Sequence, residues 1–136
     1  MPFDWKQYLE LARELLRQSE GRDADQRESL LRSVVSRAYY AAFCHARNYS
    51  RDWLKFQPNN TADDHGRLRA FLKTGKRRGV AVKLDQLRQW RNEADYSDSV
   101  TGDLPTMAHY SVSEATKLFE WLTAPTSSSK AERQHG

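Results

Sequence analysis

The chain has 136 residues and a formal net charge of +4, so it is long enough for one domain with a substantial core and too short for two. Only 38% of its residues are hydrophobic, but 11% are aromatic, which argues against a disordered chain. One cysteine and four histidines without metal-ligand spacing exclude an internal disulfide and a cysteine-based zinc cluster, so we expect neither a metal nor another cofactor.

Helical periodicity begins near the N-terminus. Apolar residues at three- and four-residue spacing predict a first helix from about Phe3 to Leu16, which Gly21 ends. A second helix is predicted over residues 24–49, and its centre, AYYAAFCHA, is apolar on all sides, as in a helix with neighbours all round. That run is too short to cross a bilayer, and no signal peptide is present, so we expect a soluble, cytoplasmic protein that binds no membrane.

The connection that follows the second helix ends in polar residues that favour a helix start. We expect a third helix at about residues 62–73, capped by the side chain of Thr61 or Asn60. Asp63 and Asp64 would lie in its first turn, where negative charge stabilises a helix.

Two more helices complete the pattern. The basic turn TGKRRG precedes a fourth helix at about residues 79–96, and a fifth begins near Pro105 and ends before Pro125. No segment predicts a strand. The sequence therefore predicts an all-α fold, a five-helix up-and-down bundle in one domain over residues 1–124, followed by a flexible tail at 125–136.

Positive charge is concentrated in one segment. Residues 66–91 hold nine Lys and Arg and one acid, whereas the remainder of the chain holds 13 basic and 17 acidic residues. This asymmetry favours a polyanionic partner, and the alternative is a solvated helical surface. If the partner is a nucleic acid, the candidate contacts are Arg67, Lys73, Lys76, Arg77, Arg78 and Arg88.

One arginine of this segment lies where an apolar residue is expected. At 100° per residue, the apolar side chains of the fourth helix form one arc, and Arg91 falls inside it. A guanidinium on the buried edge of a helix must be paired or must face a water-filled site. Asp95, one turn further on, offers an ion pair, so the sequence leaves both possibilities open.

Two stretches together resemble the HEPN family (higher eukaryote and prokaryote nucleotide-binding domains): SRAYYAAFCHARNY on the second helix and LRQWRNEADYSD on the fourth. The resemblance covers roughly residues 5–123. It implies a helical bundle that forms a homodimer and places both copies of its arginine motif in a shared cleft. Many members are metal-independent ribonucleases or toxins of toxin–antitoxin systems, often encoded beside a minimal nucleotidyltransferase that silences them.

The catalytic motif of active members is an arginine, a polar residue and, four to six intervening residues later, a histidine. Arg91 and Asn92 match the first part, and the positions open to the histidine hold Tyr96, Ser97 and Asp98. The resemblance therefore implies Arg91, Asn92 and Tyr96 as catalytic-site residues. The missing histidine weighs against cleavage, because a tyrosine with a pKa of about 10 is a poor base near pH 7.

Another histidine could supply the base. His45 lies on the apolar arc of the second helix, which is more typical of a core residue, and His65 lies at the start of the third helix beside the basic segment. Tyr96 itself is about 140° from Arg91 around the helix, so we expect both to reach one site only if the helix loosens at its end.

The sequence thus leaves three functions open. The first is a HEPN-type, RNA-directed protein: a toxin-like RNA-binding protein or a divergent metal-independent endoribonuclease with its cleft at the dimer interface. The second is a non-catalytic HEPN module that binds a nucleotide or a partner nucleotidyltransferase. The third is a helical interaction domain in which Arg91 is only structural. A homodimer is also expected because Trp5, Trp53, Trp90 and Trp121 exceed what one small bundle hides.

Overall fold

The computed structural model describes residues 2–124, and within this range the chain forms five α-helices and no strand. The all-α, five-helix prediction is therefore confirmed. The helices are α1 (Lys6–Gln18), α2 (Ala24–Trp53), α3 (Asp64–Lys73), α4 (Arg78–Tyr96) and α5 (Leu104–Trp121). The predicted flexible tail, residues 125–136, lies outside the described residues.

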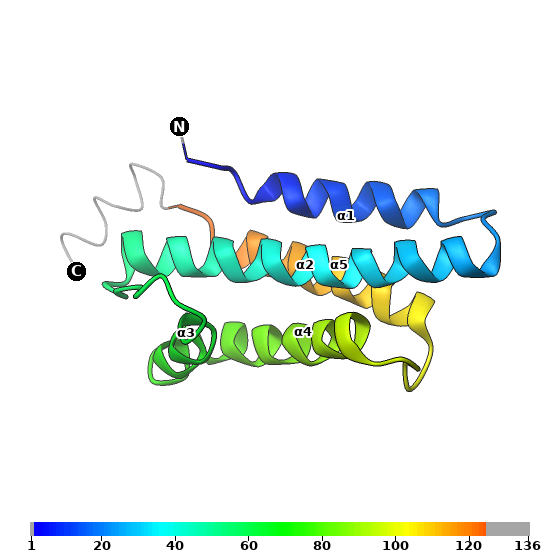
Figure 1. Cartoon of the computed structure of the whole chain (residues 1–136). Helices are drawn as coiled ribbons and strands as arrows, with labels where there is room; N and C mark the ends of the chain where they lie inside the picture. The colour runs from blue at the N-terminus through cyan, green and yellow to red at the C-terminus, as the bar shows by residue number, and fades with distance from the viewer. Residues whose placement is uncertain (1, 125–136) are drawn as a thin grey trace.

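The long helix α2 is the centre of the bundle. It packs against α1, α4 and α5, and Figure 1 shows these four helices side by side, with the short α3 near one end of α4. The alanines of the all-apolar run, Ala38, Ala41, Ala42 and Ala46, are fully buried, so neighbouring helices approach α2 closely on several sides. None of the helices in the described range combines the length and hydropathy that a membrane span requires.

The predicted boundary and cap between α2 and α3 need correction. α2 continues to Trp53, because Tyr49 and Ser50 are still buried, and α3 begins at Asp64. Neither Thr61 nor Asn60 caps α3. Instead the buried Asp64 carboxylate accepts hydrogen bonds from the backbone N–H groups of Asn59 (2.9 Å) and Asn60 (2.8 Å), so this acid orders the preceding loop rather than the helix.

The end of α4 is held by an arginine of α2. Arg32 donates to the carbonyl oxygens of Ala94 (2.8 Å), Ser97 (2.7 Å) and Asp98 (3.2 Å). These carbonyls lie at or beyond the last turn of α4, where a cation is favourable and the acceptors have no partner within the helix. Arg32 therefore determines where α4 ends and where its last residue, Tyr96, is placed.

Replacing Arg32 should destabilise the fold through this helix end. We expect Arg32→Ala to lower the free energy of unfolding by about 2 kcal/mol, because it removes charge-assisted hydrogen bonds to partly buried carbonyls. Urea denaturation followed by circular dichroism measures the change. Arg27→Ala, an exposed position of the same helix, is the matched control and should change stability by less than about 0.5 kcal/mol. Equal effects of the two variants would contradict this role.

Candidate functional site

The guanidinium of Arg91 lies among three tyrosine rings. Its central carbon is 5.0 Å from the ring centre of Tyr39, 5.4 Å from that of Tyr40 and 5.9 Å from that of Tyr96. Tyr39 and Tyr40 belong to α2, and Tyr96 is the last residue of α4. Each such contact is worth about 0.5–2 kcal/mol depending on its exposure to water. Aromatic rings, rather than a carboxylate, therefore hold Arg91 at the edge of the core.

The expected alternative, an ion pair between Arg91 and Asp95, is wrong. Asp95 accepts a hydrogen bond from the Ser36 hydroxyl at 3.2 Å, and among the described residues no carboxylate pairs with Arg91. The expectation for Tyr96 also needs correction. α4 remains helical through Tyr96, yet the tyrosine ring reaches Arg91, because both side chains are long and the helix ends there.

Two further arginines lie close to the first. Arg69 on α3 and Arg88 on α4 both face Asp85: the Arg69 Nε is 3.6 Å and an Arg88 terminal nitrogen 3.2 Å from the same carboxylate oxygen. Together with Arg91, both are near enough to Tyr39 to favour its ionised form. We call Arg69, Arg88 and Arg91 the arginine cluster. Arg69 and Arg88 thus share one carboxylate, and Arg91 has none among the described residues.

The arginine cluster also contains donors without acceptors. The Nε atoms of Arg88 and Arg91 are buried and have no hydrogen-bond partner in the described part of the chain. A buried donor without a partner costs about 1–3 kcal/mol, and more when the group is charged. An oxyanion bound by the guanidinium groups would balance the excess positive charge, so the cluster has the properties of an anion site.

Tyr39 joins the arginine cluster to a histidine. Its side chain is only 1% exposed, and burial raises the pKa of its hydroxyl to about 12 despite the nearby arginines, so the hydroxyl keeps its proton at neutral pH. The hydroxyl is hydrogen-bonded to Nδ1 of His65 on α3. Since guanidinium groups cannot accept a hydrogen bond, Nδ1 is the acceptor available to this hydroxyl, and the neutral ring then carries its proton on Nε2.

The surroundings of His65 keep the imidazole neutral. Burial, and then the positive charges of Arg91 and Arg69, lower its pKa below the ordinary value of 6.5. The ring stacks on Phe43, with 3.8 Å between ring centres and 8° between planes. In this arrangement Nε2 of the imidazole carries the proton and can only donate a hydrogen bond. Nδ1, which holds the lone pair, already accepts from Tyr39, so His65 is not a free base.

The other candidate base, His45, is placed elsewhere. Its Nε2 donates to the carbonyl of Leu122 at 2.6 Å, its ring stacks on Phe119 with 4.1 Å between centres, and burial lowers its pKa. These partners follow or belong to α5, and none is part of the arginine cluster. His45 is therefore a half-buried histidine whose Nε2 has a hydrogen-bond partner outside the arginine cluster. Asn92, the motif neighbour of Arg91, is partly buried and makes no side-chain hydrogen bond in the described range.

The predicted nucleic-acid contacts divide into groups. Arg88 is part of the arginine cluster, whereas Arg67 is paired with Asp64 at 2.7 Å and helps to order the loop before α3. Arg77 donates to the Tyr49 hydroxyl at 3.2 Å. The exposed basic side chains in or next to the turn between α3 and α4 are those of Lys73, Lys76 and Arg78.

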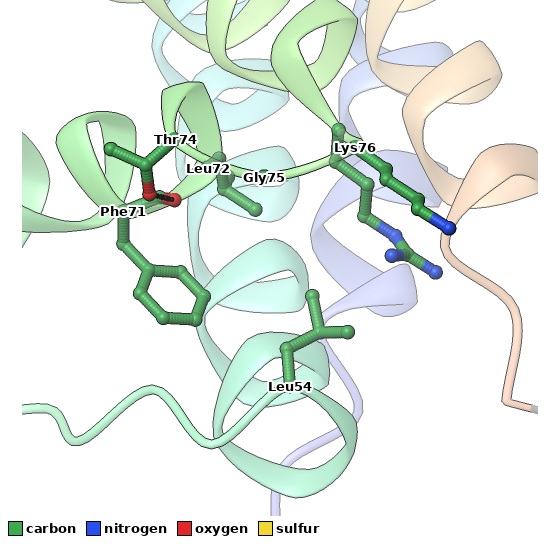
Figure 2. Close-up of a pocket in the computed structure, with 7 residues that line it drawn as sticks. Leu54, Phe71, Leu72, Thr74, Gly75 and Lys76 are labelled. Carbon is green, nitrogen blue, oxygen red and sulfur yellow. Dashed lines mark hydrogen bonds between the residues drawn. The ribbon is translucent and has the colours of Figure 1, made fainter.

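The basic turn between α3 and α4 adjoins a pocket of its own. Figure 2 shows Lys76 extending from this turn beside a pocket of about 250 Å³ whose apolar wall includes Leu54 and Phe71. Arg78 and Arg91 are thirteen positions apart on α4, which places them about 20 Å apart along its axis. The basic turn, at the start of α4, and the arginine cluster, along its second half, are therefore separate cationic regions.

Comparison with known proteins adds no relative: no family model, no curated protein and no solved structure matches the chain. Among the described residues, no group of three or more His, Cys, Asp or Glu side chains is arranged to hold a metal ion. The arginine cluster with Tyr39 and His65 is thus interpreted from its own geometry. Tyr39 and Tyr40 lie in the all-apolar run of the second helix and Arg69 lies in the basic segment, but the sequence pattern singled out none of the three as a site residue.

The electrostatic link between Arg91 and His65 can be measured. We expect His65 to titrate below pH 6.5 in the wild type and closer to it in Arg91→Ala, because removing a nearby positive charge favours the protonated imidazole. NMR of the histidine ring protons against pH measures both values. The control is Arg78→Ala, because Arg78 lies about 20 Å from Arg91 along the axis of α4. This variant should leave the His65 titration unchanged. A wild-type His65 pKa above 6.5, or the same His65 pKa in Arg91→Ala as in Arg78→Ala, would contradict the geometry.

Proposed function

We propose that this protein is a HEPN-type, RNA-directed protein that binds single-stranded RNA, with a phosphate held by the arginine cluster. The observation that carries the proposal is the cluster of three guanidinium groups in which Arg69 and Arg88 share Asp85, while Arg91 has no carboxylate partner among the described residues. The fork of a guanidinium matches a phosphodiester, which can accept two parallel hydrogen bonds from it. Guanidinium groups that outnumber their carboxylates lower the stability of a purely structural cluster, because positive charge is left uncompensated. In a phosphate site the same excess charge is neutralised by the ligand.

The aromatic rings favour a single strand over a duplex. Tyr40 is partly exposed and Tyr96 is 74% exposed, and both lie beside Arg91. Unpaired bases stack on such rings, whereas bases inside a duplex are not available to do so. The basic turn at the start of α4 supplies further cations for the same strand.

Binding is favoured over cleavage. A metal-independent ribonuclease needs a base that takes the proton of the 2′-hydroxyl, and the lone pair of His65 is occupied by Tyr39. Ribonuclease activity is the second candidate function, because His65 is joined through Tyr39 to Arg91 and bound RNA could displace that hydroxyl. The alternative partner, a nucleotide or a nucleotidyltransferase, would use the same arginine cluster.

The homodimer is part of the same proposal. Val82, Tyr110 and Trp121 on α4 and α5 have more than half of their surface exposed, and Trp90 lines a shallow pocket beside Val82 and Tyr110. Large exposed apolar side chains of this kind favour burial against another surface. Their position on α4 and α5 supports self-association through these two helices.

Removing Arg91 should separate binding from folding. We expect Arg91→Ala to weaken binding of a fluorescein-labelled single-stranded 12-mer RNA at least about tenfold, through loss of a bidentate phosphate contact. The variant should stay folded, because the removed group has no carboxylate partner to strand. Fluorescence anisotropy and thermal melts provide the two readouts, with the exposed Arg17→Ala on α1 as control.

The salt dependence of wild-type binding belongs to the same experiment. With four or five phosphates neutralised, affinity should fall roughly a hundredfold between low and physiological salt. Wild-type affinity retained in Arg91→Ala, or affinity indifferent to salt, would overturn the proposal.

A histidine at the position of Tyr96 should add chemistry to binding. The Tyr96 ring lies 5.9 Å from Arg91, so Tyr96→His would place an imidazole with a pKa of about 6.5 beside the bound phosphate. We expect this variant to cleave single-stranded RNA in the presence of EDTA, while the wild type is weak or inactive. Tyr110→His on α5 is the control for an exposed histidine. Strong wild-type cleavage that survives in Tyr96→Phe would show that another group is the base.

A further inference from the structure

A second hollow lies directly beside the arginine cluster. It is a pocket of about 360 Å³ between Tyr40, Phe43 and Arg47 of α2 on one side and residues 60–62 with His65 on the other. The ring of Tyr40 that forms its wall also contacts Arg91, and His65 is bonded to Tyr39, which contacts Arg91 too. The pocket and the arginine cluster are therefore adjacent and share the Tyr40 ring between them.

The loop that closes the pocket is held in place by buried hydrogen bonds. Asp64, 2% exposed, accepts from the backbone of Asn59 and Asn60 and from Arg67, and Arg67 also donates to the carbonyl of Gln57 at 3.0 Å. Asn60 has a φ of 61°, a left-handed conformation that asparagine tolerates better than most residues. The loop is thus formed before any ligand arrives.

The loop's own polar side chains are not used by the fold. In the described part of the chain, the Asn60 amide and the Thr61 hydroxyl make no hydrogen bond, and both residues line the pocket. Nε2–H of His65 also has no protein acceptor among the described residues. Donors and acceptors therefore surround a wall of aromatic rings, in which His65 stacks on Phe43 and Tyr40 meets His65 edge-on.

The charges around the pocket indicate what it binds. Asp64, the carboxylate of the lining, is already paired with Arg67, so the wall offers no free negative charge. Arg91 contacts the Tyr40 ring of the pocket wall, and Arg47, which lines the pocket, lies over the Phe43 ring at 5.8 Å with no carboxylate within pairing distance in the described range. A flat, uncharged ring with hydrogen-bonding edges and an anion on each side fits these surroundings.

We infer that this pocket holds one unpaired base of the RNA strand, with the adjoining phosphate on the arginine cluster and the next phosphate near Arg47. The volume accommodates a base with its ribose, and the Asn60 amide can donate to and accept from the edge of the base. Asn60, Thr61 and His65 are then specificity-determining residues. The inference rests on the proposed RNA binding, and it adds recognition of a base to recognition of the backbone.

The test compares two strands of equal charge: a 12-residue oligouridylate and a 12-residue abasic ribose-phosphate strand. We expect the wild type to bind the oligouridylate at least about tenfold more tightly, because stacking and edge contacts require a base. Ala62→Trp, an exposed loop position on the pocket rim, should remove this preference by filling the pocket and leave abasic affinity unchanged. Ala62→Ser is the matched control and should retain the preference.

A second variant protects the test against a folding defect. Asn60→Gly keeps the left-handed backbone accessible and removes only the amide, so it should reduce the preference severalfold. Equal wild-type affinity for both strands, or a preference that persists in both pocket variants, would overturn the base pocket and leave the phosphate site standing. If neither strand binds the wild type at all, the proposed function itself is overturned.

Discussion

The contact of Arg91 with the tyrosine rings of α2 is the constraint on which the rest of the site depends. It joins α4 to α2 through a charged group where an apolar side chain would pack, and it directs that charge toward Tyr39. Because rings attract a cation without neutralising it, the guanidinium keeps its full charge and its donors. Arg32 supports the arrangement by holding the end of α4, which places Tyr96 over the same guanidinium.

Several properties follow from that uncompensated charge. Arg69 and Arg88 share Asp85, so the region around Tyr39 is positive. Burial nevertheless keeps the Tyr39 hydroxyl protonated, and the hydroxyl in turn occupies the acceptor nitrogen of His65. A positive surface with neutral donors beside it is suited to hold an anion rather than to move protons, which is why binding is the favoured function.

The fold was largely predictable from the sequence, because helical periodicity and turn residues are local properties. The position of Arg91 on a buried arc was predictable for the same reason. Its partner was not, since spacing along α4 pointed to Asp95, whereas tertiary packing brought Tyr39 and Tyr40 from α2. The Tyr39–His65 bond and the Arg32 contacts join residues far apart in the chain, and no local pattern encodes them. Asp64 was predicted correctly in the first turn of α3. Its buried carboxylate, however, accepts hydrogen bonds from the preceding loop, which the sequence pattern did not indicate.

The central claim is that an RNA phosphate is bound by the guanidinium groups around Tyr39. The most direct measurement follows the arginine Nε–H signals by proton–nitrogen correlation NMR while a short single-stranded oligoribonucleotide is added. The account predicts that the Nε–H signals of Arg88 and Arg91 shift together and saturate with binding, since neither donor has a partner in the described part of the free protein. The Arg32 signal, whose guanidinium is engaged by backbone carbonyls, should stay in place. RNA binding that saturates while the Arg88 and Arg91 signals do not move would contradict it.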